Sequence, residues 1–147
     1  MATVAKFTWT GVNFLNQSIV NGGSRGTGTV LAPLFMGVGK GGATAALITD
    51  TNLNTELTTG ADTTPGTYAR AAVVNSSVTI SQTNDTLQGV ATWTDPPTAT
   101  AGSTVSEVGW FDAATVGNMW FRATFTGIAL SQGFGLQATM QAQMTTS

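Results

Sequence analysis

The segment Val105–Phe125, VSEVGWFDAATVGNMWFRATF, constrains the fold more than any other part of the sequence. Two runs rich in β-branched and aromatic residues flank a short connection of small residues, Ala113–Val116. Such runs favour β-strands, and a short connection between them favours a hairpin. The segment is therefore predicted to form a β-hairpin in which Asp112 faces Gly117 across a loop of four residues.

The register of this hairpin is predicted from its apolar and charged residues. Because side chains alternate along a strand, one register places Trp110 opposite Met119 on an apolar face and Glu107 directly across from Arg122 on the other face. A slip by one residue would destroy both features. We therefore predict a structural ion pair between Glu107 and Arg122, and we expect an exchange of the two charges to restore much of the stability that either single change removes. Trp120 then points away from Trp110, which makes Trp120 a candidate subunit contact.

Further segments have the length and composition of β-strands. They lie at residues 30–36, 68–74, 78–81, 87–93 and 134–144. In the last of them apolar residues alternate with polar ones, as in a half-buried strand. Val12–Val20 and Thr51–Leu57 are predicted to be short helices. About seven strands with one or two short helices predict a mainly all-β fold, an antiparallel β-sandwich or small barrel.

The length of 147 residues is that of a single domain. We expect this domain to span residues 11–140, between an extended N-terminal arm at 1–10 and a C-terminal tail at 141–147. The beginning of the sequence lacks the features of a signal peptide, and the longest apolar run, Val30–Val38, is too short to cross a bilayer. We therefore expect a chain that is not exported by a cleaved signal and has no membrane partner.

The low charge and the two ends of the chain suggest contacts with other subunits. Charged residues make up 8% of the sequence, against roughly 25% in ordinary soluble domains. Compositional drift is one explanation; a surface used in subunit contacts is the other, since interface cores are depleted in charge. Phe7 and Trp9 make the arm either an edge strand of the domain's own sheet or a segment that docks on a neighbour. Met144 in the tail also needs a partner, so all three are candidate subunit contacts.

The residue types argue against an enzyme. The chain contains no histidine and no cysteine, which excludes Ser-His-Asp and Cys-His catalytic arrangements, disulfides and thiolate metal sites. Five Lys and Arg residues at a net charge of −2 do not form the basic stripe of a nucleic-acid-binding protein. We thus expect no catalytic residues, no cofactor, no metal and no nucleic-acid partner. A cell-wall hydrolase that depends on Glu107 or Asp112 is the enzymatic alternative.

Two motifs that resemble functional sites have simpler structural explanations. The glycine-rich segment Gly37–Gly42 contains a lysine, but its spacing does not match a phosphate-binding loop, so a glycine-rich turn is favoured. Glu56, Arg70, Glu107 and Arg122 lie in or beside predicted structured runs, and we interpret them as ion pairs that fix strand register.

Several of these features occur together in a recognisable order. They are Gly37-Val38-Gly39, then Leu53–Leu57 with Glu56, then Arg70, then Glu107-Val108-Gly109-Trp110-Phe111-Asp112-Ala113, then Gly117–Phe125, and a last alternating strand. In this order they resemble a family of small β-rich virion structural proteins of tailed bacteriophages. The resemblance runs from about Val30 to Ala142 and is distinctive over Glu107–Phe125. It departs at Trp110 and Trp120, where smaller apolar residues are expected.

The resemblance implies a non-enzymatic structural role in the virion. The first role it suggests is a capsid decoration (cement) protein, made in the host cytoplasm and located on the capsid surface. Such a protein would sit as a homotrimer on the major capsid protein and stabilise the head by bridging capsomers. The alternative is a tail-fibre or adsorption-associated module that binds a host surface glycan, for which the tryptophans would provide stacking surfaces.

Overall fold

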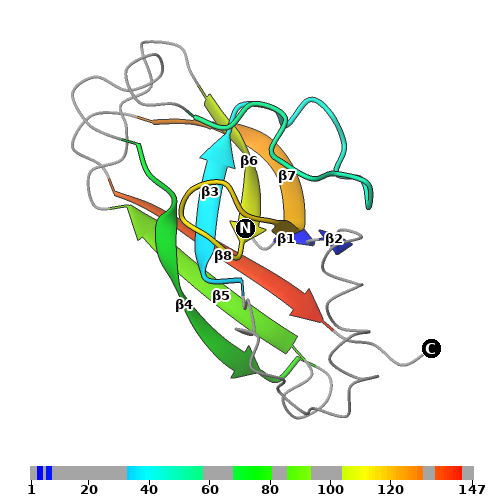
Figure 1. Cartoon of the computed structure of the whole chain (residues 1–147), viewed down its shortest axis with the longest axis vertical. Coiled ribbons are helices and arrows are strands. Elements are labelled where there is room, and N and C mark those ends of the chain that lie inside the picture. The colour runs from blue at the N-terminus through cyan, green and yellow to red at the C-terminus, as the bar shows by residue number, and fades with distance from the viewer. Residues whose placement is uncertain are drawn as a thin grey trace.

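A computed structural model of the chain describes residues 33–57, 68–80, 86–93, 104–130 and 135–143, and the backbone of residues 3–4 and 6–7. The elements in this part of the chain are strands: β1 Thr3–Val4, β2 Lys6–Phe7, β3 Phe35–Gly39, β4 Ala71–Val78, β5 Thr86–Trp93, β6 Thr104–Phe111, β7 Met119–Ala129 and β8 Leu136–Gln143 (Figure 1). None of the described residues is helical, and the predicted helix at Val12–Val20 lies outside them. The prediction of a mainly all-β fold is confirmed.

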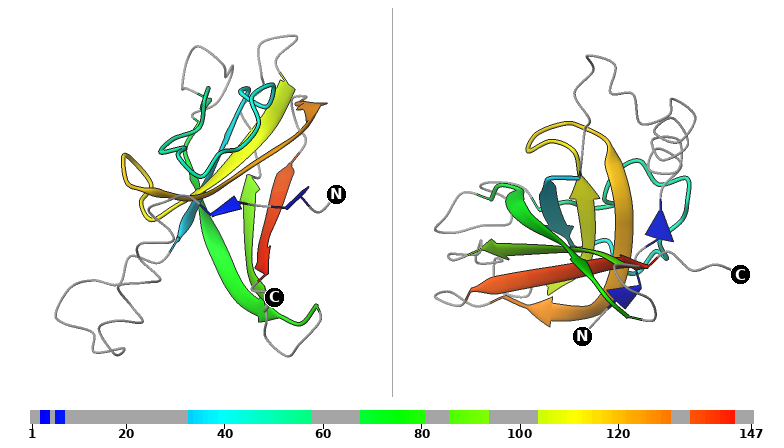
Figure 2. Two further views of the ribbon diagram at one scale, coloured as in Figure 1. Left: turned by 90° about the vertical axis from the view of Figure 1, so that its right-hand side faces the viewer. Right: turned by 90° about the horizontal axis from the view of Figure 1, so that it is seen from below.

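The strands form one curled sheet in the order β1-β8-β5-β4-β3-β6-β7-β2. The six strands from β3 to β8 pair with one another in antiparallel orientation. The β8-β5-β4 half runs across the β3-β6-β7 half, so the inner faces of the two halves enclose the core (Figure 2). β4 joins the halves, because it pairs with β5 along most of its length and with β3 at residues 71–72.

The N-terminal residues pair with both edges of this six-stranded sheet. β1 lies parallel to β8, with Thr3 opposite Met140, and β2 lies antiparallel to β7, with Lys6 opposite Arg122. The backbone of residues 3–4 and 6–7 thus pairs with the chain's own sheet, as expected if the predicted arm is an edge strand of that sheet. The side chain of Phe7, together with Trp9 and Met144, lies outside the described residues.

Trp110 on β6 occupies the centre of the core and is completely buried. Its indole Nε1 donates a hydrogen bond to Pro33 O at 2.8 Å, and its ring lies 5.4 Å from that of Phe121. Gly89 on β5 makes room for the ring, because a Cβ at this position would overlap Trp110 Cζ2. The rest of the main core comes from both halves of the sheet: Met36, Val38, Leu57, Ala91, Trp93, Val105, Val108, Trp120, Ala123, Met140 and Ala142.

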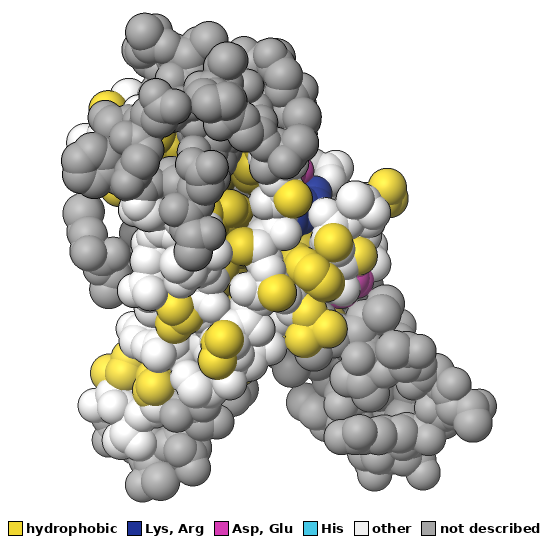
Figure 3. Space-filling view, turned by 90° about the vertical axis from the view of Figure 1, so that its left-hand side faces the viewer, with side chains coloured by type: hydrophobic (Ala, Val, Ile, Leu, Met, Phe, Trp, Pro, Cys, Tyr) yellow, Lys and Arg dark blue, Asp and Glu magenta, His cyan; other side chains and the backbone are white. Residues whose placement is uncertain are grey.

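The predicted alternation of the last strand is confirmed. Leu136, Ala138, Met140 and Ala142 of β8 belong to the main core or pack against it. The residues between them are polar and face outward, where Gln141 Nε2 donates to Gln88 Oε1 of β5 at 2.7 Å. This outer face carries no charged side chain, and few charges are visible among the hydrophobic and uncharged side chains in Figure 3.

The predicted hairpin is formed by β6 and β7, but its register differs by two residues from the predicted one. Trp110 pairs with Phe121 instead of Met119, and the direct partner of Arg122 is Gly109. The apolar face built around Trp110 keeps Phe121 in spite of this shift, because a shift of two residues leaves a side chain on the same face.

Two single-residue insertions cause the shift. Asp112 N donates to Asn118 O at 3.2 Å, so the loop spans residues 113–117 and is one residue longer than predicted. A β-bulge at Trp120 adds the second residue. The bulge also turns Trp120 into the main core, so the prediction that it points away from Trp110 is wrong.

Residues 40–57 form a third layer over the outer face of β6 and β7 (Figure 1). Leu53 from this layer is buried in a small cluster with Phe111 and Met119, and Leu57 belongs to the main core. Six of the eight residues of β6 are buried in consequence. β6 is therefore covered on both faces although it belongs to an antiparallel sheet.

The predicted helix Thr51–Leu57 is wrong, because this segment is a loop with a turn. Its backbone groups form hydrogen bonds with β3. Leu57 N donates to Val38 O at 3.0 Å, and Glu56 forms an isolated antiparallel bridge with Gly39. Other strand boundaries also differ from the predicted ones. The predicted strands 68–74 and 78–81 merge into β4, and the strand predicted at 30–36 lies at Phe35–Gly39.

Gly89→Ala tests the packing at the centre of the core. The added methyl would force Trp110 to move, so we expect a loss of about 1–3 kcal/mol in the free energy of unfolding, measured by urea denaturation. Gly135→Ala is the matched control, since the nearest atom to its Cβ would be Trp93 O at 3.4 Å. Equal stability of the two variants would contradict the described position of Trp110.

Candidate functional site

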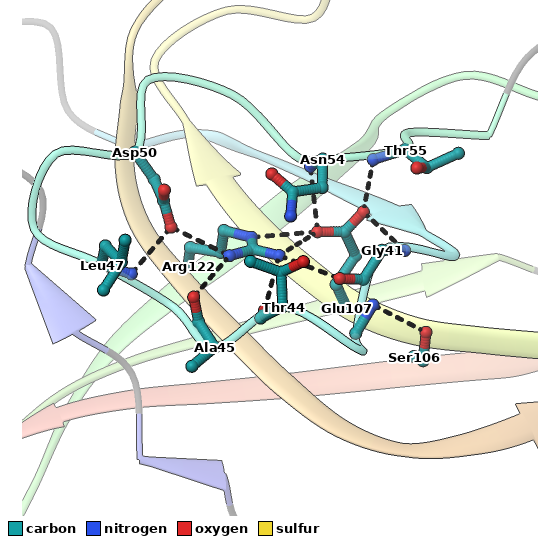
Figure 4. Close-up of polar contacts among 11 residues, drawn as sticks. Gly41, Thr44, Ala45, Leu47, Asp50, Asn54, Thr55, Ser106, Glu107 and Arg122 are labelled. Atoms are coloured by element: carbon teal, nitrogen blue, oxygen red, sulfur yellow. Dashed lines mark hydrogen bonds and ion pairs between the residues drawn. The ribbon is translucent and has the colours of Figure 1, made fainter.

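The carboxylate of Glu107 lies beneath the third layer and is inaccessible to solvent. Its Oε1 accepts hydrogen bonds from the backbone N–H groups of Gly41 at 2.9 Å and Thr55 at 2.8 Å. Its Oε2 accepts one from Asn54 N at 3.1 Å (Figure 4). Two distant turns of the 40–57 layer are therefore anchored to one side chain of β6.

Arg122 of β7 is also completely buried and lies beside Glu107. Its Nε and Nη2 donate to Glu107 Oε2 at 2.9 and 2.8 Å, and its Nη1 donates to Asp50 Oδ2 at 2.9 Å. Burial alone would lower the pKa of the Arg122 guanidinium, but its hydrogen bonds to the two carboxylates outweigh burial and raise the pKa. The other acceptors are the backbone oxygens of Gly41, Thr44 and Ala45 at 3.2, 3.2 and 3.3 Å.

The glycine-rich segment allows the backbone to approach these charges closely. A Cβ on Gly41 would lie 2.5 Å from Glu107 Oε1, and a Cβ on Gly39 would lie 2.6 Å from the same atom. Gly42 N donates to Ser106 Oγ at 3.0 Å. The backbone N–H of Gly41 thus serves a carboxylate of the chain itself, which explains the glycines without a bound phosphate.

A second ion pair joins the third layer to the residue that precedes β4. Arg70 Nε and Nη2 donate to the two carboxylate oxygens of Glu56, each at 2.8 Å. The guanidinium carbon lies 3.4 Å from the centroid of the Phe111 ring, within the range of a cation–π contact. Tyr68 OH donates to Glu56 Oε1 at 3.0 Å. Burial, together with the charge of Glu56, raises the pKa of Tyr68.

Arg70 also holds the loop of the β6–β7 hairpin. Its Nη1 donates to Val116 O at 2.7 Å and to Ala113 O at 3.3 Å. At the base of the loop, Asp112 Oδ1 accepts from Asn118 N at 2.8 Å and Asp112 Oδ2 from Asn118 Nδ2 at 2.9 Å. Both ends of the loop are therefore fixed by charged side chains.

The comparisons with known proteins identify the family. The family model described as Podophage GP4 fiber I protein gp80 matches residues 13–132, which is more than half of the chain. The chain belongs to this family. No curated protein and no solved structure matches the chain.

Membership of the gp80 fiber family confirms the predicted resemblance to small phage virion structural proteins. The matched residues include Glu107, Arg122 and the whole 40–57 layer, so the buried charge network lies inside the region that defines the family match. The family description names a fibre protein, which agrees better with the tail-fibre alternative than with capsid cement.

Of the predicted site residues, Glu107 and Arg122 are brought together, with Arg122 Nη2 at 2.8 Å from Glu107 Oε2. Trp120 is only 7% exposed, so the chain's own core covers most of the side chain that we expected to contact another subunit. Asp50 was not predicted to be a partner of Arg122. The two residues lie 72 positions apart, and no local pattern in the sequence marks their contact.

The described residues contain no group of three or more Asp and Glu side chains close enough to hold a metal ion. Within the same residues, no helix has the length and apolarity needed to cross a membrane.

Glu107→Gln is expected to destabilise the protein strongly. The change removes the charge next to the buried Arg122, and breaking a buried pair in this way costs about 3–5 kcal/mol. Urea denaturation measures the loss. Glu56→Gln is the control, because the Glu56 side chain is 25% exposed and solvent weakens the effect of its ion pair. A loss at Glu107 no larger than that at Glu56 would contradict the network.

The charge exchange Glu107→Arg with Arg122→Glu is expected not to restore stability, in contrast to the expectation from sequence. An arginine at position 107 would face three backbone N–H donors, and a glutamate at 122 would face three carbonyl oxygens. The unfolding free energy of the double variant should therefore stay as low as that of the weaker single variant. Substantial recovery would show that the pair acts by mutual attraction alone.

Proposed function

We propose that the chain is a non-enzymatic structural subunit of a phage fibre. The observation that carries the proposal is the match of residues 13–132 to a phage fibre family. A β-domain with few charged side chains suits this role, because a fibre subunit acts through contacts with neighbouring subunits and needs no reactive groups.

The use of the acidic residues supports a structural role over the hydrolase alternative. Glu107 accepts five hydrogen bonds and is 0% exposed, so a substrate has no access to its carboxylate. Asp112 is 7% exposed, and both of its oxygens accept hydrogen bonds from Asn118. A general acid or base must be within reach of the proton that it transfers, and neither residue meets this condition.

The family description agrees better with a fibre role than with a cement role on the capsid surface. The family description names a fibre and gives no support to a contact with the major capsid protein. A homotrimer, which the resemblance implied for cement proteins, is compatible with a fibre as well, and it stays a prediction.

Glycan binding by tryptophan stacking is not part of the proposal. Trp93, Trp110 and Trp120 are 8%, 0% and 7% exposed. A stacking surface requires an accessible ring face, and these three side chains do not provide one.

Quantitative peptide mass spectrometry of purified virions tests the proposal. For a fibre subunit we expect a copy number far below that of the major capsid protein, together with antibody labelling at a fibre. A copy number comparable with the capsid protein would support the cement role instead. Absence from purified particles would contradict every virion role.

A further inference from the structure

Val116 at the tip of the β6–β7 loop combines two unusual properties. Its side chain is 88% exposed, and its backbone φ is 56°. β-Branched residues rarely adopt this left-handed conformation, because it brings their Cβ substituents too close to the backbone. A strained residue persists where the surrounding structure imposes it, and such residues are concentrated at sites with a function.

The surrounding structure imposes the conformation of Val116 through Arg70. The guanidinium of Arg70 binds Val116 O at 2.7 Å and is itself held by both carboxylate oxygens of Glu56. Asp112 and Asn118 close the base of the loop. The apolar side chain of Val116 is therefore held on a fixed loop, so that little conformational entropy of this loop would be lost on binding.

An apolar cavity of about 190 Å³ lies between the two halves of the sheet. It opens at the surface where Ile128 is 49% exposed, between β7 and β8. Neither strand has a described partner on this side, because β2 pairs with β7 only at residues 121–122 and β1 pairs with β8 only at 140–141. The apolar lining comes mainly from Val105, Val108, Phe125, Ile128, Leu136 and Ala138.

The exposed valine and the cavity belong to opposite ends of the same hairpin. The loop follows Phe111 at one end of β6, whereas Thr104 pairs with Ala129 at the other end, and the residues that line the cavity are nearer to that second end. In the left view of Figure 2 the loop and the free end of β7 lie on opposite sides of the molecule. A contact between two different patches of this kind joins copies head to tail.

We propose that Val116 of one copy inserts into the cavity of the next copy. The inference rests on the proposed fibre function, for which it supplies the contact between subunits. A second copy is the occupant that the chain itself provides: the loop residues 113–117 and the residues that line the cavity are all uncharged, and an isopropyl group is small enough for the cavity. A head-to-tail contact gives a ring, such as a trimer, if its rotation closes, and a filament if it does not.

Directed disulfide formation tests this contact, because the chain has no cysteine of its own. Val116→Cys protein is mixed with Ile128→Cys protein and oxidised; Ile128 lines the cavity and is 49% exposed where the cavity opens. We expect the mixture to form several-fold more mixed dimer than either variant forms alone, and the double variant to form a ladder of linked chains. Val74→Cys is the matched control, since this valine is 74% exposed on the outer face of β4.

Equal linkage of Val74→Cys and Val116→Cys to Ile128→Cys would overturn the proposal, and so would preferential formation of Val116→Cys homodimers. Sedimentation velocity provides an independent measurement. Val116→Asp should shift associated chains to monomers, whereas Val74→Asp should leave association unchanged; the same behaviour of both variants would contradict the contact.

The copy number in virions separates this inference from the proposed function. A fibre-like copy number without specific linkage at Val116 would leave the function in place and reject the contact. Specific linkage in a protein that is absent from particles would support the contact and reject the fibre role.

Discussion

The buried pair of Glu107 and Arg122 is the interaction on which the rest of the structure depends. Transfer of each charge from water into a protein interior costs roughly several kcal/mol, and a single partner rarely compensates for this cost. Here Glu107 accepts five hydrogen bonds, and Arg122 donates to carboxylate and backbone oxygens from two sides. Most of these partners are backbone groups of residues 41–55. The backbone groups of the third layer therefore compensate for the loss of hydration of the two buried charges.

The same layer connects the core to the exposed end of the hairpin. It supplies Glu56, which orients Arg70, and Arg70 fixes the carbonyl groups of the 113–117 loop. The conformation of Val116 thus depends on a chain of polar contacts that begins next to Glu107. This arrangement links the stability of the domain to the shape of the loop that we propose as a subunit contact.

The sequence predicted the features that depend on alternation and on complementary charge. The inward face of β8, the hairpin around Trp110 and the proximity of Glu107 to Arg122 all follow from such patterns. It did not predict the loop of residues 113–117 or the bulge at Trp120, because no residue type marks either extra residue. It also suggested a helix at Thr51–Leu57, where local propensity was overridden by backbone hydrogen bonds to a distant carboxylate. Asp50 was missed for the same reason, since its partner lies 72 positions away.

Hydrogen exchange of the backbone amides bound to Glu107 tests this account most directly. Measured by NMR, the amide protons of Gly41 and Thr55 should exchange as slowly as those of the central strand β6, although both residues lie in a loop between strands. Their exchange at the rate of an open loop, while β6 stays protected, would show that the 40–57 layer does not depend on the buried carboxylate and would contradict the account.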